Sequence, residues 1–271
     1  MSGPMPPLPS YKKPPVIEVV CGVQFETLPS FSSLHYGEFY QRVKKEYPRT
    51  QEKEPLAEVF EGPQGAGLRG EIAAYDMPPL RRVFFIDSTG NFLLQLQPSR
   101  FLANWRREKA SDEYPRFAAA YERFLKGWDV LLSLFKDSGL GVPDANQYEL
   151  TYINHIPESS PAFPLGMQEY LPLFCWRSAQ PSGFLPSPRS AAFKFQFPLP
   201  DSRGTLHVSV GHGQRVSDRK GLMILDITAR GPARKDWSDM NDWFDMAHEW
   251  IVRGFTDLTS SESHSLWERE R

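Results

Sequence analysis

The chain has 271 residues, 40% of them hydrophobic and 24% charged, and a formal net charge of −2 at pH 7. These values are ordinary for a globular protein of one large domain or two small ones, and they exclude a surface that is basic throughout. The two cysteines, Cys21 and Cys175, are too few for a disulfide framework or a cysteine metal cluster, and no apolar run reaches the about 18 residues of a membrane span. We therefore expect a cytoplasmic protein.

Residues 1–15, MSGPMPPLPSYKKPP, are rich in proline and lack the apolar core of a signal peptide. We expect this segment to be a disordered arm with an extended, polyproline-like backbone. The alternative is that the arm serves as a peptide ligand for a partner protein.

The first folded segment, residues 16–26, alternates as a half-buried strand does. One face carries Ile17, Val19, Cys21, Val23 and Phe25, and the other carries Glu18, Gln24 and Glu26. Residues 34–47 then place aromatic and aliphatic side chains at helical spacing, and Pro48 closes this predicted helix. Short strands are expected near residues 56–60 and 68–75.

Two stronger strand patterns come next, RRVFFID at 81–87 and NFLLQLQPSRFLANWRR at 91–107, with a turn at 88–91 between them. A long helix is predicted over residues 115–137, because its apolar side chains form a broad stripe at 3.6-residue spacing. Glycines follow the helix at 139 and 141, where helices commonly end.

The second half repeats this order, beginning with QYELTYINHI at 147–156, which alternates like a strand. The other predicted elements are a helix at 166–174, strands at 191–197, 205–210 and 221–229, a helix at 239–255, and a last short helix that starts at the capping box Thr259–Ser260–Ser261–Glu262 and runs through Trp267.

Each half thus reads as a strand, a helix, about three strands and a long helix. Glu18 and Glu149 occupy the same place in the two opening strands, although few other letters match. We predict an α+β fold made of a duplicated β-α-β(3–4)-α unit, with an antiparallel sheet and helices on one face. The halves would be residues 16–144 and 145–271 of one compact domain, in a layout that resembles the saddle-shaped TATA-binding-protein-like folds.

The sheet face away from the helices is predicted to be polar, and we infer that it is the candidate binding surface. Its candidate residues are Gln95, Gln97, Glu149, Thr151, His155, Lys194, Gln196, His207 and Ser209, beside Glu18 and Gln24. A simply solvated face, or one buried against a second copy of the chain, is the alternative, because antiparallel sheets commonly have one wet side.

Asn154 and His155 end the alternating stretch at 147–156. His155 is in register with the polar face, whereas Asn154 is in register with the apolar one. We favour a strand that ends near Ile153, with Asn154 in a turn before Pro157. The alternative is a buried Asn154, which then needs hydrogen-bond partners.

Two glycine-rich stretches resemble phosphate-binding loops. GAGLRG at 65–70 matches the dinucleotide pattern, but no helix can begin in the EIAAYDMPP that follows, so we predict a flexible loop. GHGQRVSDRKG at 211–221 joins two strands and is predicted to be a long mobile hairpin. Its Arg215, Arg219 and Lys220 are candidate contacts for an anion.

No catalytic set is recognisable, and no metal ligands or cofactor site are predicted. His248 lies three residues after Asp245 on a predicted helix, without a second pair of ligands, so we interpret it as a salt-bridged surface histidine. No G-x-S-x-G motif occurs. Glu149 and His155 are six residues apart on one strand face, or about 20 Å, which is too far for an acid/base pair.

Four blocks resemble one family when they are taken together. They are PPVIEVVCGVQF, LQPSRFLANWRR, QYELTYINHI and FDMAHEWIVRGFTDLTSSESHSLWER. The chain is similar, from Pro14 to Trp267, to an uncharacterised, sporadically distributed family of prokaryotic proteins of about this length. The resemblance implies no activity, cofactor or catalytic residue, and its sporadic distribution is compatible with a mobile-element or phage-defence context.

Three functions follow as hypotheses. The first is a non-enzymatic binding or regulatory protein that uses the polar face and the 211–221 hairpin to bind a protein or a nucleic acid. The second is a hydrolase or nuclease with His155, His207 and Glu149 where the halves meet. The third is a structural homo-oligomer, such as a homodimer, with Trp105, Arg106 and Arg107 near the rim of its interface.

Overall fold

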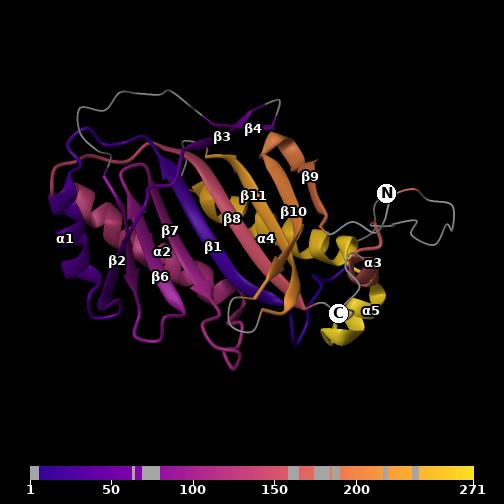
Figure 1. The fold of residues 1–271 in the computed structure, drawn as a ribbon. Coiled ribbons are helices and arrows are strands. Elements are labelled where there is room, and N and C mark those ends of the chain that lie inside the picture. Colours follow the sequence, from indigo (N-terminus) through magenta and orange to yellow (C-terminus); the bar gives the residue numbers. More distant parts are fainter. Residues whose placement is uncertain are drawn as a thin grey trace.

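The computed structural model describes residues 6–62, 65–68, 80–157, 165–173, 184, 190–215, 219–233 and 238–271. A nine-stranded antiparallel sheet dominates these residues, with the strand order β2-β5-β6-β7-β1-β8-β11-β10-β9, beside a two-stranded sheet of β3 and β4. Figure 1 shows the long helices α2 and α4 lying side by side behind the large sheet. The mixed α/β class and the large antiparallel sheet agree with the prediction.

The elements before residue 145 are β1 (Val16–Phe25), α1 (Ser33–Val43), β2 (Arg49–Lys53), β3 (Val59–Gly62), β4 (Gly65–Leu68), β5 (Arg82–Ile86), β6 (Phe92–Gln97), β7 (Arg100–Arg106) and α2 (Arg116–Asp137). Those that follow are β8 (Ala145–Pro157), α3 (Leu165–Tyr170), β9 (Ala192–Pro198), the short 3-10 turn η1 (Pro200–Ser202), β10 (Thr205–Gln214), β11 (Gly221–Pro232), α4 (Ser238–Leu258) and α5 (Ser261–Leu266).

The core lies between the helices and one face of the sheet. In β1 the predicted apolar face is confirmed for Val19, Cys21 and Val23, which are fully buried on the helix side. The strand is not half-buried as predicted, because Gln24 on the other face is only 3% exposed. Large rings fill the space beneath α2, where Trp128 packs on Phe25 and Phe101 with ring centroids 5.7 and 5.8 Å apart. Burying each such side chain contributes roughly 1.5–3 kcal/mol, so this layer holds α2 against the sheet.

The central strands β1 and β8 pair with each other although about half of the chain separates them. On one side of this pair β7 and β6 follow, and on the other β11 and β10 follow. Helix α2 comes after β7 and packs on β7 and β1, whereas α4 comes after β11 and packs on β11 and β8. Both long helices therefore cover the same face, and the opposite face is left to the polar side chains.

Several predicted boundaries differ from the structure. The segment 91–107 is two strands, β6 and β7, because a turn at Pro98 and Ser99 divides it. Strand β2 had no predicted counterpart, since its sequence RTQEK is almost wholly polar and its side chains are mostly exposed. Residues 69–75 of the second expected short strand lie outside the described residues, as does Cys175.

Asn154 corrects the interpretation of the 147–156 stretch. Strand β8 continues to Pro157, and Asn154 is only 3% exposed on the helix side of the sheet. Its side-chain amide donates to the carbonyl oxygen of Leu225 at 3.1 Å, which supplies the partner that a buried amide needs. The alternative of a buried Asn154 was therefore the right one.

The N-terminal arm is also different from the expected disordered segment, over residues 6–15. Tyr11 is 4% exposed, bridges to Arg269 and packs edge-on against Phe255. The backbone amides of Lys12 and Lys13 donate to carbonyls at the end of α5. A large aromatic ring at position 11 thus fixes the arm to the C-terminal helices; residues 1–5 lie outside the described part.

The two glycine-rich stretches are more regular than expected. Residues 65–68 form β4 and pair with β3, so this part of GAGLRG is a strand and not a flexible loop. Strands β10 and β11 stay paired as far as Gln214 and Gly221, so both ends of the predicted mobile hairpin belong to the strands. Residues 216–218 of that stretch lie outside the described residues.

At the other end of the β10–β11 pair, the backbone at residues 203–204 lies very close to the backbone at residues 230–231. Gly204 has φ of +127°, and a Cβ placed there would lie 2.0 Å from the carbonyl oxygen of Arg230. At Gly231 an added Cβ would lie 1.8 Å from the carbonyl oxygen of Arg203, which accepts the indole N–H of Trp243. Only residues without a Cβ fit here, so glycine is required at both places.

Candidate functional site

A polar cavity of about 480 Å³ lies on the sheet face opposite the long helices. The side chains that line it come from six neighbouring strands and from the segment that precedes β3. They are Glu18, Val20, Leu56, Arg82, Phe84, Leu93, Gln95, Leu102, Asn104, Arg106, Glu149, Thr151, Asp226, Thr228 and Arg230. The open face is therefore hollow and rich in charge, as a binding surface is.

A segment of the chain crosses this face and forms one border of the cavity; we name residues 54–62 the strap. Gln97 holds its first part, because the side-chain amide accepts from the N–H of Leu56 at 3.0 Å and donates to its carbonyl at 3.1 Å. Gln147 holds its last part in the same way, through the N–H of Glu61 and the carbonyl of Val59. Two glutamines of the sheet thus replace strand partners for the strap.

Glu61 anchors the strap to the sheet by charge. Its Oε1 lies 2.5 Å from Nε2 of His207 and 3.6 Å from Nη1 of Arg230. The carboxylate is almost fully buried, so a charged partner is needed to offset its desolvation. His207 therefore holds the strap instead of facing the cavity.

On the β1 side of the cavity, four side chains form a chain of hydrogen bonds. Arg82 donates to Gln95 at 2.9 Å, Gln95 donates to Asn104 at 2.7 Å, and Asn104 donates to Glu18 at 2.7 Å. Each donor thereby fixes the orientation of the next amide, so that Glu18 receives a hydrogen bond that stabilises its carboxylate form.

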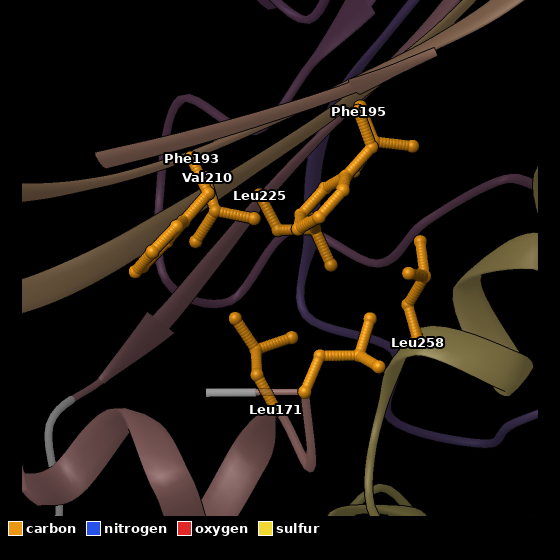
Figure 2. Close-up of a pocket in the computed structure, with 8 residues that line it drawn as sticks. Leu171, Phe193, Phe195, Val210, Leu225 and Leu258 are labelled. Atoms are coloured by element: carbon orange, nitrogen blue, oxygen red, sulfur yellow. The ribbon is translucent and has the colours of Figure 1, made fainter. Parts of the chain in front are cut away.

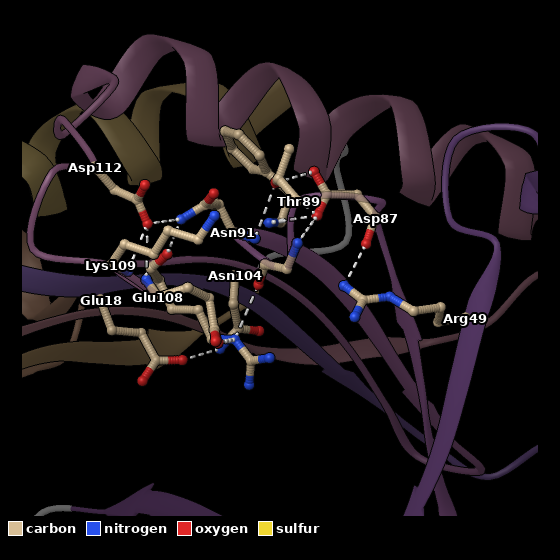
Figure 3. A network of polar contacts seen from close by, with 12 residues as sticks. Glu18, Arg49, Asp87, Thr89, Asn91, Asn104, Glu108, Lys109 and Asp112 are labelled. Atoms are coloured by element: carbon tan, nitrogen blue, oxygen red, sulfur yellow. Dashed lines mark hydrogen bonds and ion pairs between the residues drawn. The ribbon is translucent and has the colours of Figure 1, made fainter. Parts of the chain in front are cut away.

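The rim on this side is a rigid turn, drawn in Figure 3. The carboxylate of Asp87 accepts from the hydroxyl of Thr89 and from the N–H of Gly90 at 2.7 Å, as is typical of Asx turns. The carbonyl of Gly90 then accepts from Nε of Arg106 at 3.0 Å, and Glu108 forms an ion pair with the same nitrogen at 2.6 Å. These contacts hold the guanidinium of Arg106 at the cavity edge.

The β8 side of the cavity is built from β8 and β11. Arg230 donates from Nε to Glu149 at 2.7 Å, forming an ion pair within the sheet face. Beside it, the hydroxyls of Thr151 and Thr228 lie 2.8 Å apart, and Thr228 donates to Asp226 at 3.0 Å. Asp226 therefore receives one neutral hydrogen bond, as Glu18 does on the other side.

Glu18 and Asp226 are the two carboxyls of the cavity that form no ion pair among the described residues. Burial raises the pKa of Glu18, and the charge of Asp226 raises it further, whereas Asn104 and Arg106 lower it. Burial likewise raises the pKa of Asp226, with a further contribution from Glu149. Two desolvated carboxyls that repel each other are a feature of functional sites more than of structural ones.

The strand register relates the two sides of the cavity. Arg106 lies opposite Glu18 and Asn104 opposite Val20 in the β1–β7 pair. Arg230 lies opposite Glu149 and Thr228 opposite Thr151 in the β8–β11 pair. In the β1–β8 pair, Val20 lies opposite Thr151. Glu18 is two residues before Val20 in β1, and Glu149 is two residues before Thr151 in β8. Each side thus presents a glutamate opposite an arginine.

The residues predicted from sequence divide into four groups. Gln95, Glu149 and Thr151 line the cavity. Gln97 and His207 hold the strap beside it. The exposed Lys194 and Gln196 lie farther out on β9, paired with Ser209 and His207 of β10.

The fourth group, with His155 and the hairpin residues Arg215, Arg219 and Lys220, lies away from the cavity. His155 pairs with Ile224, about 13 Å along β8 from Thr151 by strand rise. The hairpin lies beyond Gly221, about 17 Å along β11 from Asp226. The register therefore does not bring His155 together with His207 and Glu149.

Sequence reasoning missed several of the polar cavity residues. Those missed are Arg82, Asn104, Asp226, Thr228 and Arg230, whereas Arg106 was expected only as a rim residue of a homo-oligomer. A signal was present, since alternate positions of RFLANWR and of ILDITAR carry these polar side chains. Only the strand pairing shows that the two alternations face the same hollow.

Trp105 and His248 do not lie where the sequence analysis placed them. Trp105 is 2% exposed and packs on Tyr114 in the core, so it does not lie at the rim of the open face. His248 forms no salt bridge among the described residues; its ring stacks on Phe117 with centroids 4.2 Å apart, and Nδ1 lies 3.0 Å from the hydroxyl of Tyr152. The helix turns it toward the core and not toward solvent.

Other hollows of the described part are smaller or apolar. Figure 2 shows one in which side chains of β9, β10 and β11 face Leu171 and Leu258, with a volume of about 30 Å³. Such a space is of the size of a single water molecule and belongs to the core.

No group of three or more metal-ligating side chains occurs in the part of the chain that the structure describes. None of the helices described there combines the length and the hydropathy needed to span a membrane.

Comparison with known proteins gives one distant likeness to report. No family model matches the chain, and no curated protein matches it. Among solved structures, DynU16, a protein in the dynemicin biosynthetic locus, is similar at 11% identity and a TM-score of 0.27, over 93% of this chain and 99% of that chain. A likeness of this degree carries no argument about the function of the chain.

Proposed function

We propose that the chain is a non-enzymatic binding protein whose polar cavity receives a cationic side chain of a partner protein. The observation that carries this proposal is the pair Glu18 and Asp226, two carboxyls with raised pKa values and no ion-pair partner among the described residues. A lysine or arginine from the partner would offset their desolvation and their mutual repulsion.

The arginines around Glu18 and Asp226 indicate that the partner also carries hydrogen-bond acceptors. Arg82 and Arg106 lie on one side and Arg230 on the other, where Glu149 already pairs with it. A partner segment with a basic residue flanked by acceptors fits this order of charges. A nucleic acid fits it less well, because phosphates would approach the carboxyls at the centre of the cavity.

The repeated glutamate–arginine arrangement supports the duplicated β-α-β(3–4)-α unit as a proposal for the fold. In the saddle-like layout that we propose for this fold, the partner contacts the open face of the sheet. Membership of the sporadically distributed prokaryotic family, a mobile-element or phage-defence context and a cytoplasmic location belong to the same proposal.

The other two hypotheses receive less support. A hydrolase that uses His155, His207 and Glu149 needs these side chains within direct or one-water reach, and the register separates His155 from the other two. A homo-oligomer that buries the whole open face would have to cover the unpaired carboxyls of Glu18 and Asp226, which costs stability unless cations meet them.

The double substitution Glu18→Gln with Asp226→Asn tests the proposal. We expect it to abolish partner capture while the free energy of unfolding at pH 7 stays equal or increases. The sign follows from the raised pKa values: such groups stabilise the fold below the ordinary carboxyl pKa, and this contribution is lost as the pH rises through the folded-state pKa. The glutamine and asparagine side chains have the same shape but do not ionise, so the variant does not lose this stability at pH 7.

The measurement is affinity purification of the tagged chain from its host, with bound protein and nucleic acid both quantified. A matched variant carries Arg215→Glu, Arg219→Glu and Lys220→Glu in the hairpin and is expected to capture the partner like the wild type. Equal capture by the cavity double variant would refute the proposal. Capture that depends on the hairpin and is lost after nuclease treatment would instead favour a nucleic-acid partner.

A further inference from the structure

A second cavity, of about 200 Å³, lies on the helix side of the sheet and is independent of the polar one. Its walls are α4, with Ile251, Val252 and Phe255, and the sheet, with Ile227. The remaining walls are the N-terminal arm and the start of α2, with Phe117. Most of the exposed lining is apolar, but several hydrogen-bonding side chains, among them Tyr152, His248 and Arg116, also line it, which is the usual composition of a small-molecule site.

The arm closes this cavity through specific contacts. The hydroxyl of Tyr11 lies 2.9 Å from that of Thr256, and the carbonyl of Tyr11 accepts from Nη1 of Arg116 at 2.9 Å. Ser10 donates to Glu270 at 2.9 Å, and its carbonyl accepts the N–H of the same residue. Together with the buried ring of Tyr11 against Phe255, these contacts fix the arm as one wall of the cavity.

Tyr114, Tyr152 and His248 form a line of hydrogen bonds along the cavity wall. The two hydroxyls lie 3.0 Å apart, and that of Tyr152 lies 3.0 Å from Nδ1 of His248. Burial lowers the pKa of His248 to about 4, so the ring is neutral at pH 7. Since an imidazole nitrogen is a stronger base than a phenol oxygen, Tyr152 donates to Nδ1, and the proton of the ring is then on Nε2.

Nε2 of His248 has no hydrogen-bond partner among the described residues. The ring itself is fixed, because it stacks on Phe117 at 4.2 Å between centroids. The line therefore ends in an oriented N–H donor at the wall of an apolar cavity. A ligand atom that accepts this hydrogen bond would complete the line.

The charged side chains that line the cavity are Arg116 and Arg271, and no aspartate or glutamate side chain is among its lining residues. An acceptor that carries negative charge is therefore favoured over a neutral or cationic one. The size limits the rest of the molecule. An apolar protein cavity of about 150 Å³ holds benzene, so one of 200 Å³ holds a single ring with one or two small substituents.

We propose that this second cavity binds a single-ring aromatic carboxylate, with the ring between α4 and the arm and the carboxylate on His248 Nε2 and Arg116. Its aromatic walls, Tyr114, Phe117 and Tyr152, suit a planar ring. The site is distinct from the polar cavity and does not depend on the function proposed for it.

The test is a titration of the full chain with benzoate, toluene and octanoate, monitored by ligand NMR and by the melting temperature. We expect saturable benzoate binding that raises the melting temperature, weaker binding of toluene, and no displacement of benzoate by octanoate. Tighter binding of octanoate, with displacement of benzoate, would replace the aromatic class with an acyl chain and overturn the proposal. So would the absence of saturable benzoate binding.

Two substitutions locate the binding. Val252→Trp fills the cavity from a half-exposed position and is expected to abolish binding of benzoate and toluene. His248→Phe keeps the stack on Phe117 but removes the donor, so it is expected to weaken benzoate by roughly tenfold, the worth of a hydrogen bond to a charged group, and to leave toluene unchanged. The Glu18→Gln, Asp226→Asn protein serves as the control that binds benzoate normally.

Each of these variants also gives a result that contradicts the proposal. A folded Val252→Trp protein with wild-type benzoate affinity would place the binding elsewhere. An equal loss of benzoate and toluene in His248→Phe would show that the histidine only maintains the shape of the cavity.

Discussion

Gly204→Ala is expected to lower the free energy of unfolding by about 3 kcal/mol or more, the sum of a strained backbone and of overpacking. The residue has φ of +127°, which an alanine adopts only at a cost, and its added Cβ would lie 2.0 Å from the carbonyl oxygen of Arg230. Neither group can move freely, since Arg230 belongs to β11 and pairs with Thr205, the residue that follows Gly204. In a chain of this size the loss corresponds to roughly 6–12 °C in melting temperature.

Strand β10, which begins just after Gly204, supplies the matched control. Gly211 has no atom within 4 Å of an added Cβ, so Gly211→Ala should change stability by no more than about 0.5 kcal/mol. Thermal and denaturant unfolding followed by circular dichroism measures both variants. Similar stabilities for the two proteins would mean that the crossing of Gly204 with Arg230 relaxes easily. Since Arg230 also lines the polar cavity, Gly204→Ala should weaken partner binding as well.

Acidification from pH 6.5 to pH 4 is expected to destabilise the wild-type chain, and His248→Phe should remove the largest histidine contribution to that change. Burial lowers the pKa of His248 from the ordinary 6.5 to about 4 in the folded state. In this interval the unfolded chain binds the proton and the folded chain does not, so stability falls as the pH falls. The difference between the two pKa values amounts to about 3 kcal/mol.

Other groups titrate in the same interval, so the comparison between the two proteins is needed. Burial raises the pKa values of Glu18 and Asp226, which makes acidification favour the fold, whereas burial lowers that of His155 and acts in the direction of His248. These contributions are common to both proteins and cancel in the difference. Melting curves of both proteins at intervals of half a pH unit measure this difference in stability. Parallel curves for wild type and His248→Phe would show that His248 is not responsible.

The parts of the fold that the sequence predicts best are those governed by local periodicity. The helix expected at 115–137 is α2 almost to the residue, because a 22-residue stripe of aromatic and aliphatic side chains has one way to be buried. Strand β2 escaped prediction for the opposite reason: its polar residues pair with β5 at the sheet edge without burying a face.

The candidate site was predicted only in part, because its residues are joined by pairings distant in sequence. Gln95 and Glu149 were selected from their alternation, and both line the cavity. Arg106 and Asp226 share that hollow only through the central β1–β8 pair, which no local pattern reveals. The strap was harder still, since side-chain amides of Gln97 and Gln147 hold it in place of a strand ladder.

The pairing of β1 with β8 also has a consequence during synthesis on the ribosome. Until residues 145–157 emerge, β1 has β7 on one side and an unsatisfied row of amides and carbonyls on the other. Such an edge is a template for another chain. A fragment ending at residue 144 is therefore expected to dimerise through two antiparallel copies of β1, because the second copy of β1 can take the place of β8.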